Sequence, residues 1–142
     1  KRSLQQKIEL SKKYKEKQMN NKDKRFKQYV GTKGEDAAAG LLRDKGYNIL
    51  RRNYSVHNVG EIDIIAEKDT DIHIFEVRTR RNLGSFPDSA ESVMQNKRNR
   101  VVRTAERFVN ENDLFDRNIV FEVIRVTHDA QGNILIIDFV PF

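Results

Sequence analysis

Positive charge is concentrated in the first 30 residues of the chain, and this segregation limits which part can form a folded core. Residues 1–30 hold 11 of the 27 Lys and Arg residues but only three of the 21 acidic residues, a net charge of +8. The rest of the chain carries a net charge of −2. Apolar side chains in the basic segment are too sparse for a continuous buried stripe. We therefore predict a basic N-terminal arm or helix over residues 1–30 and one folded domain over residues 31–142.

Several classes of chemistry are excluded by composition. The chain has no Cys, which removes disulfides, thiolate zinc sites and a cysteine nucleophile. The three histidines, at positions 57, 73 and 128, are scattered without ligand spacing, so we expect them to be structural or surface residues. The longest apolar runs, such as residues 134–137, are far shorter than the roughly 20 residues that a membrane span needs. We expect a soluble, cytoplasmic protein with no membrane partner.

Hydrophobic periodicity beyond residue 30 predicts an α/β fold. Apolar residues at helical spacing predict helices over residues 34–45 and 93–110, with Gly46 as the stop of the first and a loop over residues 83–88 before the second. Extended, β-rich runs are predicted at residues 47–50 with 54–56, 61–66, 71–78, 119–126 and 134–140. The order is α-β-β-β-α-β-β. It predicts a mixed β-sheet flanked by helices, with hairpins across residues 67–70 and 129–133.

Three acidic residues interrupt or head apolar patterns. Glu76 continues the face of Ile72 and Ile74 because side chains alternate along a strand, although a strand end in solvent is an alternative for it. Asp63 interrupts a β-branched run, and Glu35 heads the buried stripe of the first helix. We predict that the three carboxylates converge. Such hard oxygen ligands suit Mg²⁺ or Mn²⁺, ions that polarise a phosphodiester and activate water.

Several motifs in this order resemble the YraN family of bacterial endonuclease-like proteins. They are Gly34-Glu35 with Ala38, residues 60–66 (Gly-Glu-Ile-Asp-Ile-Ile-Ala), residues 75–80 (Phe-Glu-Val-Arg-Thr-Arg), and Lys97-Arg98 with Arg100 followed by Thr104-Ala105. The resemblance covers about residues 30–142. It implies a restriction-endonuclease-like fold, similar to PD-(D/E)XK nucleases and archaeal Holliday-junction resolvases. It also implies that Glu35, Asp63 and Glu76 stand where those enzymes hold their acidic ligands.

One position departs from the family pattern. Where the family usually has Glu-Val-Lys, this chain has Glu76-Val77-Arg78, and Arg is a permanently protonated fork that cannot act as a base. Arg78 is still suited to stabilising phosphate charge. Lys97 is the first candidate for a substitute ammonium, with Lys68 as an open alternative. The backbone carbonyl of Val77 is a further candidate metal ligand, and Glu122, where the family tends to have Asp, is assigned no catalytic role.

Basic residues after the acidic motifs predict a nucleic-acid-binding surface. The second helix places a ridge opposite its apolar stripe, and the end of the third strand adds further charge; the residues are Lys97, Arg100, Arg103 or Thr104, Arg107, Arg80 and Arg81. The leading hypothesis is a metal-dependent nuclease acting on DNA with branched or single-stranded parts. A nucleic-acid-binding module weakened in cleavage by Arg78 is the alternative. A homodimer, a solubilising role for residues 1–30, and a protein or RNA partner docking on them also stay open.

Overall fold

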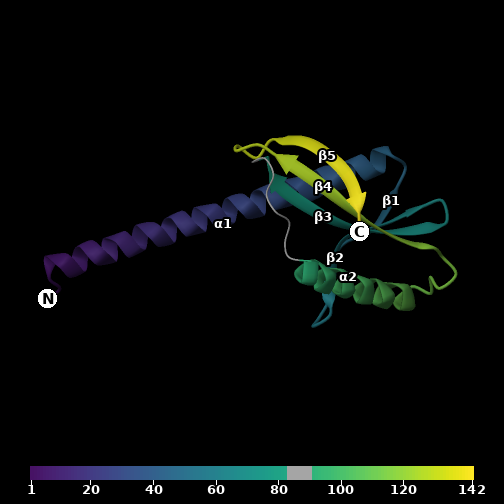
Figure 1. Ribbon diagram of the computed structural model, residues 1–142, viewed down its shortest axis with the longest axis horizontal. Coiled ribbons are helices and arrows are strands. Elements are labelled where there is room, and N and C mark those ends of the chain that lie inside the picture. Colours follow the sequence, from purple (N-terminus) through teal and green to yellow (C-terminus); the bar gives the residue numbers. More distant parts are fainter. Residues whose placement is uncertain (83–90) are drawn as a thin grey trace. The chain divides into compact units, whose positions relative to one another are not determined.

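The computed structural model describes residues 1–82 and 91–142, and side chains within 1–82 and 94–142. Figure 1 shows its seven elements, which are α1 (Leu4–Asp44), β1 (Asn48–Val56), β2 (Gly60–Lys68), β3 (Asp71–Arg81), α2 (Glu91–Glu111), β4 (Ile119–His128) and β5 (Ile134–Pro141). Internal contacts divide the chain into two units, Lys1–Lys33 and Gly34–Phe142. The predicted loop at residues 83–88 lies outside the described residues.

Helix α1 starts far earlier than the predicted helix over residues 34–45. Its start is a capping box: the Gln6 N–H donates to Ser3 Oγ at 3.2 Å, and the Ser3 N–H donates to Gln6 Oε1 at 2.9 Å. No proline interrupts the segment that follows, so the backbone hydrogen bonds continue to Asp44. Of the two alternatives for residues 1–30, the structure therefore shows a helix, and its side chains are mostly exposed.

Gly46 ends the helix as predicted. Its φ of 90° lies in the left-handed region that favours glycine. The N–H of Tyr47 donates to the Leu42 carbonyl and that of Gly46 to the Arg43 carbonyl, at 2.9 and 3.0 Å. This pair of bonds satisfies two of the last helical carbonyls and directs the chain into β1.

The five strands form one mixed sheet in the order β1-β2-β3-β4-β5. Strand β2 pairs in antiparallel fashion with both β1 and β3, and β4 and β5 form another antiparallel pair. Strands β3 and β4 are parallel, and α2 lies between them in the sequence, because parallel neighbours need a crossover. The predicted element order is confirmed, and the arrangement is consistent with a nuclease-like α/β fold.

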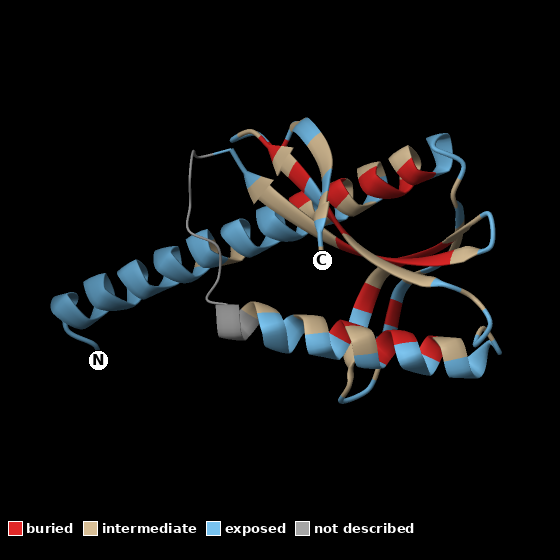
Figure 2. Cartoon of the chain, turned by 45° about the vertical axis from the view of Figure 1, so that its right-hand side comes forward, coloured by how far each residue is buried: buried red, intermediate tan, exposed pale blue. Residues whose placement is uncertain are grey.

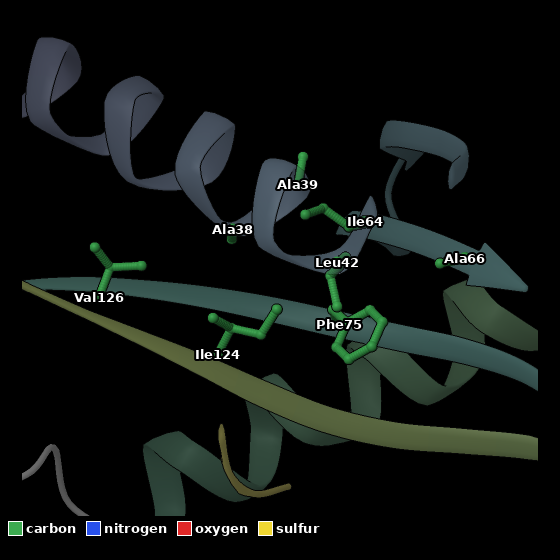
Figure 3. Packing of buried hydrophobic residues seen from close by; sticks show 8 residues of the cluster. All are labelled: Ala38, Ala39, Leu42, Ile64, Ala66, Phe75, Ile124 and Val126. Atoms are coloured by element: carbon green, nitrogen blue, oxygen red, sulfur yellow. The ribbon is translucent and has the colours of Figure 1, made fainter. Parts of the chain in front are cut away.

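Strand β3 is the centre of the domain because it is buried on both faces. Ile72 and Ile74 belong to an apolar cluster with α2, while Phe75 belongs to a second cluster with Ala38 and Leu42 of α1. Figure 3 shows this second cluster, in which Leu42 lies close to Phe75. Figure 2 shows the same concentration of burial along the inner strands and on one side of α2. Alternating residues of β3 therefore face two different layers.

The β4–β5 hairpin contains the turn chemistry that its sequence predicts. One Oδ1 atom of Asp129 accepts the backbone N–H groups of Gln131 and Asn133, at 2.9 and 2.8 Å. Gly132 has a φ of 85°, which needs a residue without a Cβ. The β2–β3 turn similarly uses Asp69 with a φ of 56°. Both predicted hairpins are confirmed.

Within the described residues, neither helix combines the length and the apolar character that crossing a membrane would require. The long helix α1 is dominated by charged and polar residues.

Candidate active site

The candidate site begins where the ladder between β2 and β3 ends. Their antiparallel register runs from Lys68 opposite Asp71 to Ile64 opposite Phe75. Asp63 and Glu76 are the next residues on the two strands. Here the Asp63 carboxylate accepts a hydrogen bond of 2.8 Å from the backbone N–H of Val77. This bond holds the carboxylate beside β3, next to the position of Glu76.

Asp63 is an aspartate whose charge the fold disfavours. Burial is the main cause that raises its pKa, to about 6 from an ordinary value of 3.8. The Val77 N–H lowers the pKa, but the charges of Glu35, Glu76 and Glu61 raise it further. The electrostatic coupling shows that negative charge from α1, β2 and β3 gathers around Asp63. A group tuned toward neutral pH by burial and like charge is typical of functional sites.

Glu76 is buried, with only 5% of its side chain exposed, and it faces the α2 side of the sheet as predicted. The ammonium of Lys97, on α2, lies 2.5 Å from Glu76 Oε1. A guanidinium nitrogen of Arg78 lies 3.5 Å from Oε2. Oε1 is fully buried and lacks a hydrogen bond of good geometry despite the close ammonium. The carboxylate is thus compensated by charge while one oxygen still lacks a well-directed partner.

Glu35 is held by a residue that the sequence did not single out. A guanidinium nitrogen of Arg52, on β1, lies 3.4 Å from Glu35 Oε1 and 2.7 Å from Asp36 Oδ1. The Glu35 side chain is 17% exposed. The adjacent acidic pair in α1 signals that a cation should face it, but only the fold selects Arg52. Glu61 was also missed as a charge that acts on Asp63.

The structure separates the two lysine candidates. Lys97 contacts Glu76, whereas the ammonium of Lys68 lies 4.9 Å above the ring of Tyr47. Tyr47 packs against Phe75, on the face of β3 opposite to Glu76. Lys97 is therefore the lysine at the carboxylate cluster. Arg78 lies there as well, beside Glu76.

The arginines of the predicted basic ridge on α2 are exposed, but its alternative member Thr104 is not. Lys97, Arg100, Arg103 and Arg107 are exposed. Thr104 is completely buried, so its alternative place on the basic face is wrong. Its hydroxyl donates to the Arg100 carbonyl at 2.7 Å, and it lies against Gly60 of β2, where a Cβ would meet Thr104 Oγ1 at 2.7 Å. On β3, Arg80 is half-buried and Arg81 is exposed.

Comparison with known proteins places the chain in a family. The model of the "Uncharacterised protein family UPF0102" matches residues 34–126. A UPF0102 protein of Dictyoglomus turgidum is 37% identical over 123 residues, which cover 87% of this chain and 98% of that protein. A UPF0102 protein of Moorella thermoacetica is 42% identical over 104 residues, covering 73% of this chain and 85% of the relative. The chain belongs to the UPF0102 family. This is the YraN family, so the resemblance read from the motifs is confirmed.

The UPF0102 match includes Glu35, Asp63, Glu76 and the α2 ridge, since all lie within residues 34–126. The description of the family assigns no activity. Family membership therefore supports the endonuclease-like fold but does not identify a reaction.

The residues present in this UPF0102 chain fit the predicted metal site only in part. In the ranges that the structure describes, no three acidic or histidine side chains are grouped so as to hold a metal ion. Glu35 forms an ion pair with Arg52, and Glu76 forms one with Lys97. Mg²⁺, however, is commonly bound through one or two carboxylates together with substrate phosphates. Asp63 and the poorly satisfied Glu76 oxygen suit that mode, and ligation by all three carboxylates stays a prediction.

Proposed function

We propose that this UPF0102 protein is a metal-dependent nuclease that cleaves DNA, selecting branched or single-stranded regions by structure. The observation that carries the proposal is the Asp63 carboxylate, fixed by the Val77 N–H in a negatively charged environment where its pKa rises to about 6. A structural aspartate gains nothing from that environment. A bound divalent cation would offset its cost.

Two carboxylates of the site would supply the principal ligands for this reaction. Asp63 and Glu76 would hold Mg²⁺ or Mn²⁺, with the Val77 carbonyl and Glu35 as further ligands. When bound, such an ion supplies Lewis-acid polarisation of the phosphodiester and lowers the pKa of water. The Val77 N–H keeps the Asp63 carboxylate in one orientation, and Arg52 restrains Glu35.

Lys97 and Arg78 would stabilise charge on the phosphate. Both approach Glu76, so a phosphate next to that carboxylate lies within reach of both cations. Arg78 cannot serve as a base because its guanidinium stays protonated. Lys97 is a compact charge that is suited to positioning the attacking water. We therefore assign Lys97 the role of the lysine that is missing from the β3 motif.

The exposed cations of α2 would bind the DNA backbone. Lys97, Arg100, Arg103 and Arg107 line exposed positions of one helix, and Arg80 and Arg81 lie at the end of β3. Such contacts to phosphates tolerate many sequences, fix the register of the duplex and weaken with salt. This supports selection by DNA structure rather than by base sequence. We propose that residues 1–30, with a net charge of +8, add contacts of the same kind in the cytoplasm.

Cleavage of a DNA panel tests the proposal. We expect the purified chain with Mg²⁺ or Mn²⁺ to cut branched, nicked or single-stranded DNA, and EDTA to stop the reaction. Asp63→Ala should abolish cleavage and alter metal-dependent DNA binding, while Asp129→Ala, in the β4–β5 turn, is the control that keeps it. If the whole panel remains uncut and Asp63→Ala binds DNA like the parent chain, the enzyme assignment falls.

A second function is favoured by Arg78, namely a nucleic-acid-binding module on a nuclease scaffold that has lost most of its cleavage. The observation behind it is that Glu76 already has two cationic neighbours, one of them an arginine where the family usually has lysine. Under this reading Arg78→Lys should raise cleavage from undetectable to measurable. Gel-based cleavage by Arg78→Lys, with Arg43→Lys at an exposed position of α1 as the control, separates the two functions. No gain in cleavage would remove the significance of Arg78.

A further inference from the structure

A second pocket lies on the face of β3 opposite to Glu76. It has a volume of about 310 Å³, near the lower bound for small-molecule sites. Its lining consists of Lys45, Tyr47, Lys68, Glu122 and Phe139. Glu122 is in register with Phe75, and neighbouring residues in register share a face, so the pocket belongs to the α1 side. It is therefore separate from the carboxylate cluster.

Aromatic rings form the inner wall of this pocket. The ring of Tyr47 lies edge-on to His73 and Phe75, with centroid separations of 4.9 and 5.5 Å. Phe139, which is 36% exposed, packs against Phe75 at 6.3 Å. Such aromatic side chains are suited to binding a planar heteroaromatic ring, because stacking tolerates any base.

Two ammonium groups lie over rings of the aromatic wall. Lys68 lies 4.9 Å from the centroid of Tyr47, and Lys45 lies 5.4 Å from that of Phe139. Lys45 is exposed and Lys68 half-buried, so both ammonium groups remain within reach of a ligand at the rim. A pair of lysines beside an aromatic wall favours an anionic group such as a phosphate monoester.

An acceptor inside the pocket is left without a strong donor. Glu122 Oε1 lies 3.6 Å from Nδ1 of His73, which is too far for a hydrogen bond. Nδ1 is buried and has no hydrogen-bond partner, and His73 is only 9% exposed. The Glu122 side chain is 30% exposed toward the pocket that it lines. A ligand that donates N–H groups would satisfy this carboxylate.

We propose that this pocket binds a guanine nucleotide, with the base taking the place of the two ammonium groups over Tyr47 and Phe139, and with Lys45 and Lys68 binding its phosphate. Guanine presents two adjacent N–H donors, which a carboxylate such as Glu122 accepts as a fork. Thymine presents a single N–H flanked by carbonyls, and Glu122 repels those carbonyls. A free nucleotide and a nucleotide within a DNA strand share this chemistry.

Titration of the full chain by two-dimensional NMR, in EDTA, tests the site. The probes are dGMP, dTMP, inorganic phosphate, and nine-residue DNA strands of thymidine with and without one central guanosine. We expect dGMP to shift the amide signals of Lys45, Lys68 and Glu122, and to bind at least about tenfold more tightly than dTMP or phosphate. If the guanosine-containing strand binds more tightly than both dGMP and the all-thymidine strand, the occupant is part of a strand; if it gains nothing over the all-thymidine strand, the occupant is a free nucleotide.

Matched variants make the test specific. Lys68→Gln should weaken dGMP binding about two- to fivefold, the effect of losing one partly exposed ion pair. Lys33→Gln, which makes the same charge change at another half-buried lysine over a tyrosine ring but outside this pocket, should leave it unchanged. Glu122→Gln should narrow the preference for dGMP over dTMP, and circular dichroism checks that each variant is folded. Equal binding of dGMP, dTMP and phosphate, or no effect of Lys68→Gln, overturns the proposal.

Nucleotide binding at this pocket does not depend on the proposed nuclease activity. Binding is measured without a divalent cation, and Asp63→Asn should bind dGMP as tightly as the parent chain. Loss of cleavage and loss of nucleotide binding are therefore separate results.

Discussion

Two aspartates of this chain accept backbone N–H groups, and their acidities shift in opposite directions. Asp129, in the β4–β5 turn, accepts N–H groups from Gln131 and Asn133, and these bonds lower its pKa. Asp63, at the end of the β2–β3 ladder, accepts one from Val77, yet burial and neighbouring carboxylates raise its pKa to about 6. The same residue type is thus stabilised as an anion in one hairpin and destabilised in the other.

The difference separates a structural carboxylate from a functional candidate. Asp129 is surrounded by donors and solvent, so its charge supports the turn. Asp138, on β5, is similar, because Arg125 at 2.6 Å lowers its pKa. Asp63 is instead buried, and Glu35, Glu76 and Glu61 raise its pKa further. Ionised Asp63 therefore opposes folding, whereas ionised Asp129 favours it.

The largest expected effect is on catalysis. Asp63→Ala should lower kcat about 100- to 1000-fold, as the loss of one electrostatic group at a reacting centre does. Asp129→Ala should leave kcat within about twofold, although it destabilises the turn that its carboxylate holds. Steady-state cleavage of the preferred DNA measures both. Similar losses in the two variants would remove the distinction between the two hairpins.

Stability should respond to pH at Asp63. The pKa of Asp63 is about 6 in the folded state and 3.8 in the unfolded state. Below pH 4 both states keep the proton, so Asp63 costs no unfolding free energy. Between pH 4 and 6 the unfolded state loses its proton first, and the free energy of unfolding falls as pH rises. Above pH 6, the loss of unfolding free energy reaches about 2 to 3 kcal/mol.

Asp63→Asn isolates the effect of Asp63 ionisation on stability, because the asparagine side chain still accepts the Val77 N–H through its oxygen but does not ionise. Urea denaturation should show the variant gaining stability relative to the parent chain between pH 4 and 7. A difference between the two chains that stays constant with pH would show that Asp63 ionises normally in the folded state.

Packing beside the carboxylates is tested at Gly60. A Cβ there would lie 2.7 Å from Thr104 Oγ1 and 3.1 Å from the Arg100 carbonyl oxygen. Because a backbone carbonyl on α2 cannot move freely, Gly60→Ala should cost about 1 to 2 kcal/mol of unfolding free energy. Gly40→Ala, in α1 with nothing within 4 Å of the added atom, should instead gain about 0.5 to 1 kcal/mol. Thermal denaturation compares them, and a stabilising Gly60→Ala would contradict this packing.

The smallest effect is expected at the exposed ion pair of the second hairpin. Asp138→Asn removes the bond to Arg125 and should cost about 0.5 kcal/mol, since both side chains are more than a third exposed. The loss should vanish in 1 M salt, where exposed charges are screened. Urea denaturation at low and high salt measures it. A loss as large in high salt as in low salt would show that Asp138 acts through packing rather than through charge.

Much of the candidate site was predictable because local patterns govern it. The alternation along residues 71–78 indicated that Glu76 faces the core with Ile72 and Ile74, and the structure buries it there. The sequence ranked Lys97 ahead of Lys68 but left both open. Lys68 is 8 residues from Glu76 along the chain and Lys97 is 21 residues away, yet the crossover from β3 into α2 brings Lys97 to that carboxylate. Thr104 was misassigned because helical spacing does not say how close β2 approaches α2.

The sequence by itself determined the order of helices and strands, the Gly46 stop and the turn at residues 129–133, because periodicity and turn chemistry depend on neighbours along the chain. It did not determine that α1 begins at Leu4. Only the tertiary structure decided that Arg52 restrains Glu35, that the Asp63 carboxylate binds the Val77 N–H, and that Glu122 lies beside His73. These contacts join residues on different strands and helices. Their energies depend on burial and on charges brought together by folding, which no local pattern contains.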